Sequence, residues 1–278
     1  MMGPYGAARD TMAVPPAELE RNGLFDAALF PDADDARWLH GVQWEPVRGG
    51  SGRLRPAECV DLQANTQVST EPGMPLVGAL PFLTVAEYRC KATSHPIEDA
   101  FRLALQHLAQ GEQRAVERAV SAGEVGNEPT FLSAVDVTPA GSLPGLLAAV
   151  GILEAALSDA SGLAGVLHAP RRWAATIRKG TRPERPAKDG PARTIAGNLW
   201  SFGGGYQNTP PTGKASSGPG EFWMFATPRP FILRGDPWVQ PFGQPVSKDT
   251  NDLVLLAQRD YMVGWSYEAF AVHVDVGA

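Results

Sequence analysis

Residues 96–122, PIEDAFRLALQHLAQGEQRAVERAVSA, decide the fold. Their apolar side chains recur at helical spacing and form one stripe, which comprises Ile97, Ala100, Phe101, Ala104, Leu105, Leu108, Ala115, Val116 and Ala119. Pro96 suits the first helical position and Gly123 can end the helix, so we predict a rod roughly 40 Å long that is weakest at Gly111. The opposite face is polar and should meet solvent or a partner; it comprises Arg102, Gln106, Gln110, Gln113, Glu117 and Arg118.

A long β-hairpin is predicted just before this helix, over residues 57–91. In residues 60–68 apolar and polar side chains alternate, which is typical of a strand with one buried face. The run PFLTVAEYRCK at 81–91 provides the return strand, and the sequence EPGMP at 71–75 is a strong turn signal between the two. Because a lone hairpin of this length is only marginally stable in water, we expect it to lie on a neighbouring subunit.

The two cysteines, Cys59 and Cys90, lie at equal distances from the centre of this hairpin, at Met74 and Pro75. An unbulged hairpin would therefore place the two thiols opposite each other. Two cysteines cannot form a disulfide framework, however, and a reducing cytoplasm favours two free thiols.

The composition is that of a globular protein. Hydrophobic residues make up 44% of the 278 residues and charged residues 19%, so the chain can bury a large core without disulfides or metals. The net charge of -6 argues against a dedicated DNA-binding protein, because binding to the phosphate backbone requires an excess of lysine and arginine. No apolar run approaches the roughly 18 residues of a membrane span, and the N-terminus lacks the apolar core of a signal peptide, so we expect no membrane partner.

The first 46 residues are interpreted as an extension with one short helix, at 16–26. Phe30, Trp38 and Trp44 lie on an otherwise loop-like background. Aromatic side chains on an irregular segment usually pack on another surface. That surface belongs either to the same molecule or to a partner, and composition does not distinguish the two.

A second region, of mixed helices and strands, is predicted from residue 127 onward. Ser142 is expected to cap an apolar helix that stops at Gly162, and the run GVLHAP at 165–170 has the composition of a short buried strand. Pro170 is expected to start another short helix, and residues 171–193 are strongly basic and are interpreted as a loop region. Further strands are predicted at 198–202, 221–227, 230–235, 253–266 and 267–276.

Three features invite a catalytic or ligand-binding interpretation. The run GGG at 203–205 lacks the Gly-Lys-Ser/Thr ending of a phosphate loop, so we interpret it as a loop that needs positive φ angles or a close backbone approach. His168 ends a strand where an α/β active site could lie, but a lone histidine there is more often a satisfied structural residue. Glu112 and Glu117 are five residues apart on the long helix and do not share a face, so they do not form an acid and base pair.

No other pattern supports catalysis, a metal or a cofactor. The five histidines are scattered, neither Cys59 nor Cys90 has a nearby second ligand, and no serine nucleophile elbow is present. The basic region 171–193 has Trp173 as its single aromatic residue and offers no stacking platform for a nucleic acid strand. A solvated loop, or charge pairing with the acidic edge of a neighbour, is favoured. We therefore predict a protein that is not an enzyme, with no catalytic, cofactor-binding or metal-binding residues.

The order of these parts resembles the Hong Kong 97-type capsid fold of tailed double-stranded DNA bacteriophages. The run TNDLVLLAQRDYMVGWSYEAFAVHVDV looks like the closing element of its P-domain, with Arg259 and Ala269 at the family's Arg and Ala positions, and GEQRAVERAVSAGEVGNEP, GVLHAP and FGGGYQN look like actinobacteriophage capsid proteins. The resemblance implies an α+β protein made of five parts. These are an N-terminal arm at 1–46, an E-loop hairpin at 47–93, the spine helix of the P-domain at 94–126, a central A-domain at 127–245 and C-terminal P-domain strands at 246–278.

The resemblance also implies a function. Copies of a major capsid protein assemble into pentamers and hexamers of an icosahedral head, a virion capsid built in the cytoplasm of the bacterial host, which encloses double-stranded DNA with little specific binding. A separate scaffolding protein is expected, because only about 46 residues precede the hairpin and no heptad repeat is visible among them. A portal and decoration proteins are further candidate partners. The first lysine, Lys91, lies beyond the hairpin tip, so we expect a shell without covalent lysine crosslinks.

Two alternatives stay open at this stage. An encapsulin, a cellular compartment that encloses cargo enzymes, uses the same fold, and the sequence does not separate it from a phage capsid. A cytosolic α+β enzyme with a site near His168 and the GGGY loop is the alternative from a different class.

Overall fold

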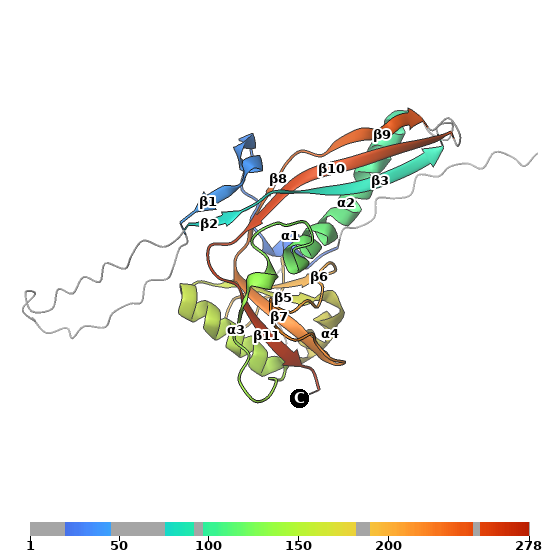
Figure 1. Cartoon of the computed structure of the whole chain (residues 1–278). Helices are drawn as coiled ribbons and strands as arrows, with labels where there is room; N and C mark the ends of the chain where they lie inside the picture. Colours follow the sequence, from blue (N-terminus) through green and yellow to red (C-terminus); the bar gives the residue numbers. More distant parts are fainter. Residues whose placement is uncertain (1–19, 46–75, 92–96, 182–189, 247–250, 278) are drawn as a thin grey trace, which may run out of the picture.

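The computed structural model describes residues 20–45, 76–91, 97–181, 190–246 and 251–277. Its longest helix, α2 (Ile97–Ala122), confirms the predicted rod. The apolar stripe is buried at Ala100, Ala104 and Leu108, whereas Ile97 in the first turn is exposed. In Figure 1, α2 lies along a long sheet, and a second sheet with its own helices lies below it.

The long sheet has four strands: β3 (Phe82–Lys91), β8 (Phe231–Arg234), β9 (Trp238–Val246) and β10 (Asp252–Gly264). The central strand is β10, which pairs antiparallel with β3 on one side and with both β8 and β9 on the other. Alternate residues of β10, Leu253, Leu255 and Ala257, pack under the buried stripe of α2. Side chains on one face of the strand, which recur every two residues, thus pack against the apolar stripe of the helix, which recurs every 3.6 residues, and the helix and the sheet form two packed layers.

The return strand of the predicted hairpin is present as β3, but its partner among the described residues is β10. Cys90 lies opposite Leu253 in this pairing, and its thiol is free. The outgoing strand at 60–68, the turn at 71–75 and Cys59 lie outside the described residues. Upstream of β3, β2 (Val77–Ala79) pairs with β1 (Val42–Trp44) in a small two-stranded sheet.

Strand β9 is not predicted from the sequence. Two prolines interrupt the run WVQPFGQPV, and proline removes a hydrogen-bond donor from a strand. The structure tolerates them because, among the described residues, β9 is an edge strand that pairs with β10 alone, and its register shifts between Leu253 and Leu255. A sequence pattern does not show whether a strand lies at the edge of a sheet, where prolines are tolerated, or in its centre, where they are not.

The second sheet has five strands in the order β4-β11-β7-β5-β6. Their bounds are β4 (Val135–Asp136), β5 (Gly165–Pro170), β6 (Leu199–Gly203), β7 (Glu221–Pro228) and β11 (Phe270–Asp275). Two helices, α3 (Leu146–Ser161) and α4 (Ala174–Thr181), pack on the same apolar face of this sheet. Every residue of β5 and β6 is buried, which confirms the fully buried strand predicted for GVLHAP.

The closing segment at 246–278 is divided between the two sheets. Its first strand, β10, is the centre of the long sheet, whereas β11 pairs with β7 and β4 in the five-stranded sheet. The two strands are joined through Trp265, which is buried between the sheets. The segment therefore does not form a single pair of strands, and it ties the two sheets together.

Helix α3 begins three residues later than the sequence predicts. Ser142 does not cap it, because Pro144 and Gly145 intervene, and Gly145 takes the N-cap position without a side-chain hydrogen bond. The predicted end is confirmed: Gly162 has a φ of 65°, and its amide donates to the carbonyl of Ser158. A left-handed residue at this position is what glycine supplies at low cost.

Within the described part of the N-terminal extension, the helix is shorter than predicted. It is α1 (Leu24–Ala27), and residues 1–19 lie outside the description. Phe30, Trp38 and Trp44 each contact side chains of the same molecule, which is one of the two alternatives that the composition left open. Trp38, in the 3-10 helix Ala36–His40, packs with Ala79 and Met262, and the ring of Trp44 meets that of Phe231 at 5.0 Å.

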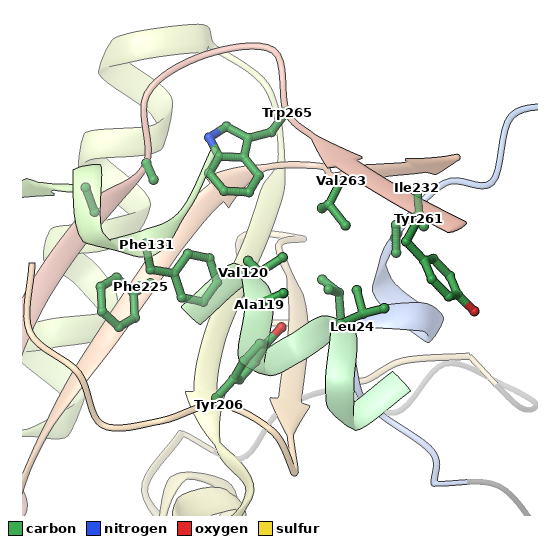
Figure 2. Packing of buried hydrophobic residues seen from close by; sticks show 14 of the residues in the cluster. Leu24, Ala119, Val120, Phe131, Tyr206, Phe225, Ile232, Tyr261, Val263 and Trp265 are labelled. Carbon is green, nitrogen blue, oxygen red and sulfur yellow. The ribbon is translucent and has the colours of Figure 1, made fainter. Parts of the chain in front are cut away.

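The two sheets meet in a junction core, shown in Figure 2. Phe131, in the 3-10 helix Phe131–Ser133, stacks on Phe225 of β7 with ring centroids 4.7 Å apart. Val120 at the end of α2 and Val263 of β10 pack from the long-sheet side. One hydrophobic core therefore joins the parts, and the other face of the five-stranded sheet has its own core under α3 and α4.

Candidate functional site

His168, the candidate for an enzyme site, lies fully buried in the middle of the five-stranded sheet. Its Nδ1 is 2.9 Å from the hydroxyl of Tyr206 and its Nε2 is 2.8 Å from the hydroxyl of Thr227. Burial lowers the pKa of His168 to about 3, so the ring is neutral at physiological pH. Both ring nitrogens form hydrogen bonds with neutral side chains inside the core, so His168 is a satisfied structural residue.

The low pKa of His168 predicts a pH dependence of stability. A folded-state pKa below the unfolded value of 6.5 adds stability above pH 6.5, and this stability is lost as the pH falls toward 3, at about 1.4 kcal/mol per unit. We expect His168→Gln to flatten this part of the pH profile, measured by chemical unfolding of the unassembled chain between pH 4 and 7. Equal slopes in both proteins would contradict the assignment.

The glycine run at 203–205 serves a close backbone approach. A Cβ at Gly205 would lie 2.1 Å from the carbonyl oxygen of Arg114 on α2, so only glycine fits there without movement. The three glycines do not have positive φ angles, so the close approach is the alternative that holds. The loop that follows, up to Gly220, contains no strand or helix.

The burial of Glu117 differs from what the sequence pattern predicts. It was expected on the exposed face of α2, but its side chain is fully buried. Its Oε1 accepts the amide of Leu24 at 3.0 Å and its Oε2 accepts the amide of Gly205 at 2.8 Å. Burial raises the pKa of Glu117, and the two backbone hydrogen bonds oppose this effect.

A signal for this burial exists in the sequence. The last two turns of α2 carry Ala115, Val116, Ala119, Val120 and Ala122, which leaves little polar surface around the helix end. An amphipathic helix that becomes apolar on most sides is buried there, so any charge among those residues needs internal partners.

Glu112 has a different set of partners, which confirms that the two glutamates do not act as a pair. It accepts two hydrogen bonds from Nη1 of Arg259, at 2.8 and 3.1 Å, with Arg234 3.9 Å away. Both partners are largely buried, with 6% of Glu112 and 15% of Arg259 exposed. Burial and the neighbouring Glu112 raise the pKa of Tyr261 in this cluster. Arg259 thus holds the centre of β10 to the middle of α2.

The basic region 171–193 divides into several parts. Its first residues form a 3-10 helix, Arg171–Trp173, and α4 follows, because Ile177 is anchored in the core beside α3. The short helix predicted to start at Pro170 is thus confirmed and extends through Thr181, so the basic loop interpretation does not hold for 171–181, and 182–189 lie outside the described residues. Arg171 pairs with Glu20 at 3.1 Å, so part of the basic charge is used within the molecule.

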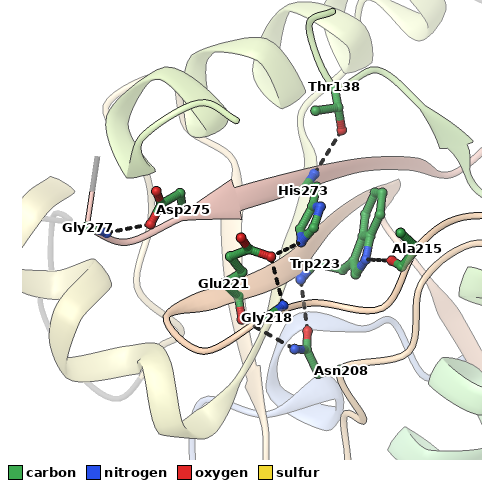
Figure 3. A network of polar contacts seen from close by, with 9 residues as sticks. All are labelled: Thr138, Asn208, Ala215, Gly218, Glu221, Trp223, His273, Asp275 and Gly277. Atoms are coloured by element: carbon green, nitrogen blue, oxygen red, sulfur yellow. Dashed lines mark hydrogen bonds and ion pairs between the residues drawn. The ribbon is translucent and has the colours of Figure 1, made fainter. Parts of the chain in front are cut away.

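A further polar network lies on β7 and β11 (Figure 3). The rings of His273 and Trp223, opposite each other in the two strands, stack with centroids 4.7 Å apart. His273 Nε2 is 3.1 Å from Glu221, which also accepts the amide of Gly218, and the His273 amide donates to Thr138. These contacts hold two loops to the sheet, which gives this scattered histidine a structural role.

Among the described residues, no group of three or more His, Cys, Asp or Glu side chains could hold a metal ion. In the same part of the chain, no helix is long and apolar enough to cross a membrane.

Comparison with known proteins rests on structure. No family model and no curated protein matches the sequence. The capsid of a native GTA particle matches with a TM-score of 0.57 and 12% identity, over 97% of this chain and 95% of that one. The chain has the Hong Kong 97-type capsid fold. A structure of Microbacterium phage Oxtober96 aligns with a TM-score of 0.52 and 11% identity, over 96% and 95% of the two chains.

The Hong Kong 97-type fold also occurs in a cellular shell. The SrpI encapsulin complex from Synechococcus elongatus aligns with a TM-score of 0.54 and 13% identity, over 98% of this chain and 94% of that one. The α+β class and the fold that the sequence resemblance implies are thus confirmed. Because the sequence identities are only 11–13%, these similarities establish a shared fold.

In this Hong Kong 97-type chain, apolar side chains are exposed on the long sheet and beside the five-stranded sheet. Leu83 and Val85 project from the uncovered face of β3, and Leu147 and Leu163 lie exposed at the two ends of α3. A groove of about 490 Å³ runs beside α2 above the Glu112–Arg259 pair; it is lined by Arg102, Leu105, Gln106, Leu108, Ala109, Glu112, Pro237 and Arg259.

Proposed function

We propose that this chain is a major capsid protein that assembles into the icosahedral head of a tailed double-stranded DNA bacteriophage. The observation that carries the proposal is the likeness to a capsid over nearly the whole of both chains, helix and both sheets included. The interior supports a structural role, because the candidate catalytic histidine is occupied by two internal hydrogen bonds. The enzyme alternative therefore loses His168, the residue on which the sequence based it.

Assembly would use many contacts of modest area, each weak alone and summed over a closed lattice. In this proposal the A-domains at 127–245 meet around the pentamers and hexamers, and the hairpin at 47–93 reaches a neighbour by the part that precedes β3, because β3 itself pairs with β10 of the same chain. The basic residues from 178 to 193 face a neighbour or the capsomer axis. The exposed side chains of β3 and α3 are candidates for surfaces that assembly buries.

Electron microscopy of the purified chain, produced with its scaffolding protein, tests this proposal. We expect closed shells of uniform diameter, with five-fold and six-fold capsomers. If only small discrete particles form with scaffold present, the chain is not a shell subunit.

The alternative is an encapsulin-like compartment, which the likeness to the Synechococcus shell supports. The contents of native particles separate the two. A phage head protects double-stranded DNA from nuclease, and a compartment contains a cargo enzyme and no genome. The net charge of -6 is consistent with a shell that encloses DNA without binding its phosphate backbone tightly.

In the phage proposal, a separate scaffolding protein, a portal and decoration proteins are the remaining partners, and the assembled location is the virion. Portal and terminase genes beside this one are expected for a phage.

We predict that the shell lacks covalent lysine crosslinks. The hairpin tip contains no lysine, and the ammonium of Lys91, at the end of β3, is 2.7 Å from Asp252 on β10. Mature particles boiled in reducing detergent should run at the mass of one chain. A ladder of higher masses would contradict this prediction.

A further inference from the structure

Residues 20–29, which we call the strap, cross from one sheet to the other. At the five-stranded sheet, Arg171 donates hydrogen bonds to the carboxylate of Glu20 at 3.1 Å and to the carbonyl oxygen of the next residue at 2.9 Å. The amide of Phe202 on β6 donates to the carbonyl of Asn22 at 2.6 Å. The first part of the strap is therefore held at the ends of β5 and β6.

The second part of the strap is held by the long sheet. Leu29 donates its amide to the carbonyl of Pro230 and accepts the amide of Ile232, both at 2.8 Å, so it extends the sheet beside β8. The ring of Phe25 stacks on Tyr261 of β10 at 5.8 Å. The strap thus has one attachment in each sheet.

Glu117 lies between these two attachments. One oxygen of its buried carboxylate accepts an amide of the strap, from Leu24, and the other accepts an amide of the glycine loop, from Gly205. Leu24 is itself fully buried in the junction core. A single ionisable group on α2 therefore holds the strap and the five-stranded sheet's loop at the same time.

We propose that the strap sets the angle between the two sheets and that the carboxylate of Glu117 is its latch. No strand of one sheet pairs with a strand of the other among the described residues; the sheets are joined through the connections at 123–134, 229–230 and 265–269 and through the junction core, so their angle depends on side-chain packing and on the strap. A carboxylate accepts at both oxygens, and hydrogen bonds to a charged acceptor are stronger than neutral ones. The proposal concerns the subunit alone and holds whatever shell it builds.

The variant Glu117→Gln tests the latch, because a carboxamide accepts at one atom and presents donors at the other. In the unassembled full-length chain, hydrogen exchange at the amides of Leu24 and Gly205 should become at least about tenfold faster at one of the two, which corresponds to losing one hydrogen bond of this kind. Glu98→Gln, an exposed glutamate in the first turn of the same helix, is the matched control and should leave both amides unchanged.

The angle needs its own measurement. Spin labels on Glu87→Cys in β3 and Asp159→Cys in α3, in a chain with Cys59→Ser and Cys90→Ser, report the distance between the two sheets. We expect a narrow distance distribution that broadens in Glu117→Gln and in Arg171→Ala, which frees the outer end of the strap. Arg171→Ala carries the test if Glu117→Gln does not fold. Distributions unchanged in the variants that fold would overturn the proposal.

Discussion

Arg259→Met should destabilise the chain by about 3–5 kcal/mol, because it leaves the carboxylate of Glu112 buried without its cation. The value is expected near the lower end, since Arg234, 3.9 Å from Glu112, can approach the carboxylate. Chemical unfolding of the unassembled chain measures the loss. As Arg259 holds the centre of β10 to α2, the helix and the long sheet should lose their mutual packing first.

A double variant separates a lost pair from lost packing. Glu112→Leu combined with Arg259→Met removes both charges and should recover much of the stability, because a well-packed apolar replacement of a buried pair is often neutral. Arg102→Met is the control on the same helix, as its ion pair with Asp99 is exposed and should contribute less than about 1 kcal/mol. A loss under about 1 kcal/mol in Arg259→Met itself would show that the pair is not buried as described.

Phe131→Ala should cost about 3–5 kcal/mol by leaving a cavity in the junction core. Phe131 is 1% exposed, stacks on Phe225 at 4.7 Å and contacts the ring of His168 at 4.9 Å, so its loss removes aromatic contacts as well as volume. Unfolding of the unassembled chain and near-ultraviolet circular dichroism would measure this effect.

The matched control for Phe131 is an apolar residue outside the core. Leu147 is 64% exposed at the start of α3, and its replacement by Ala should change the stability of the unassembled chain by less than about 0.5 kcal/mol. Phe131→Leu should lie between the two, because it keeps most of the volume. A junction that tolerates Phe131→Ala as well as Leu147→Ala would mean that the two sheets pack loosely.

Local patterns predict several elements well. The stripe in α2, the strand-like run of β3 and the continuous apolar runs of β5 and β7 are each carried by neighbours in sequence. The end of α3 is also local, since Gly162 alone supplies the left-handed turn. These elements appear where the sequence places them because their signals need no distant partner.

Errors in the sequence interpretation have a common cause. Glu117 looks exposed by helical position, and it is buried because two amides from distant segments reach it. Strand β9 looks too rich in proline, and it exists because it occupies an edge beside β10. Both depend on what the rest of the chain brings alongside.

The long helix at 96–122 and the order of elements around it were determined by the sequence itself, through periodicity, caps and turn residues that act over a few positions. The tertiary structure alone decided that β3 pairs with β10, that the closing strands enter different sheets, and that Glu112 and Glu117 hold separate partners. Strand pairing and charge burial join residues about 45 to 180 positions apart, and their energies depend on geometry that no local pattern records.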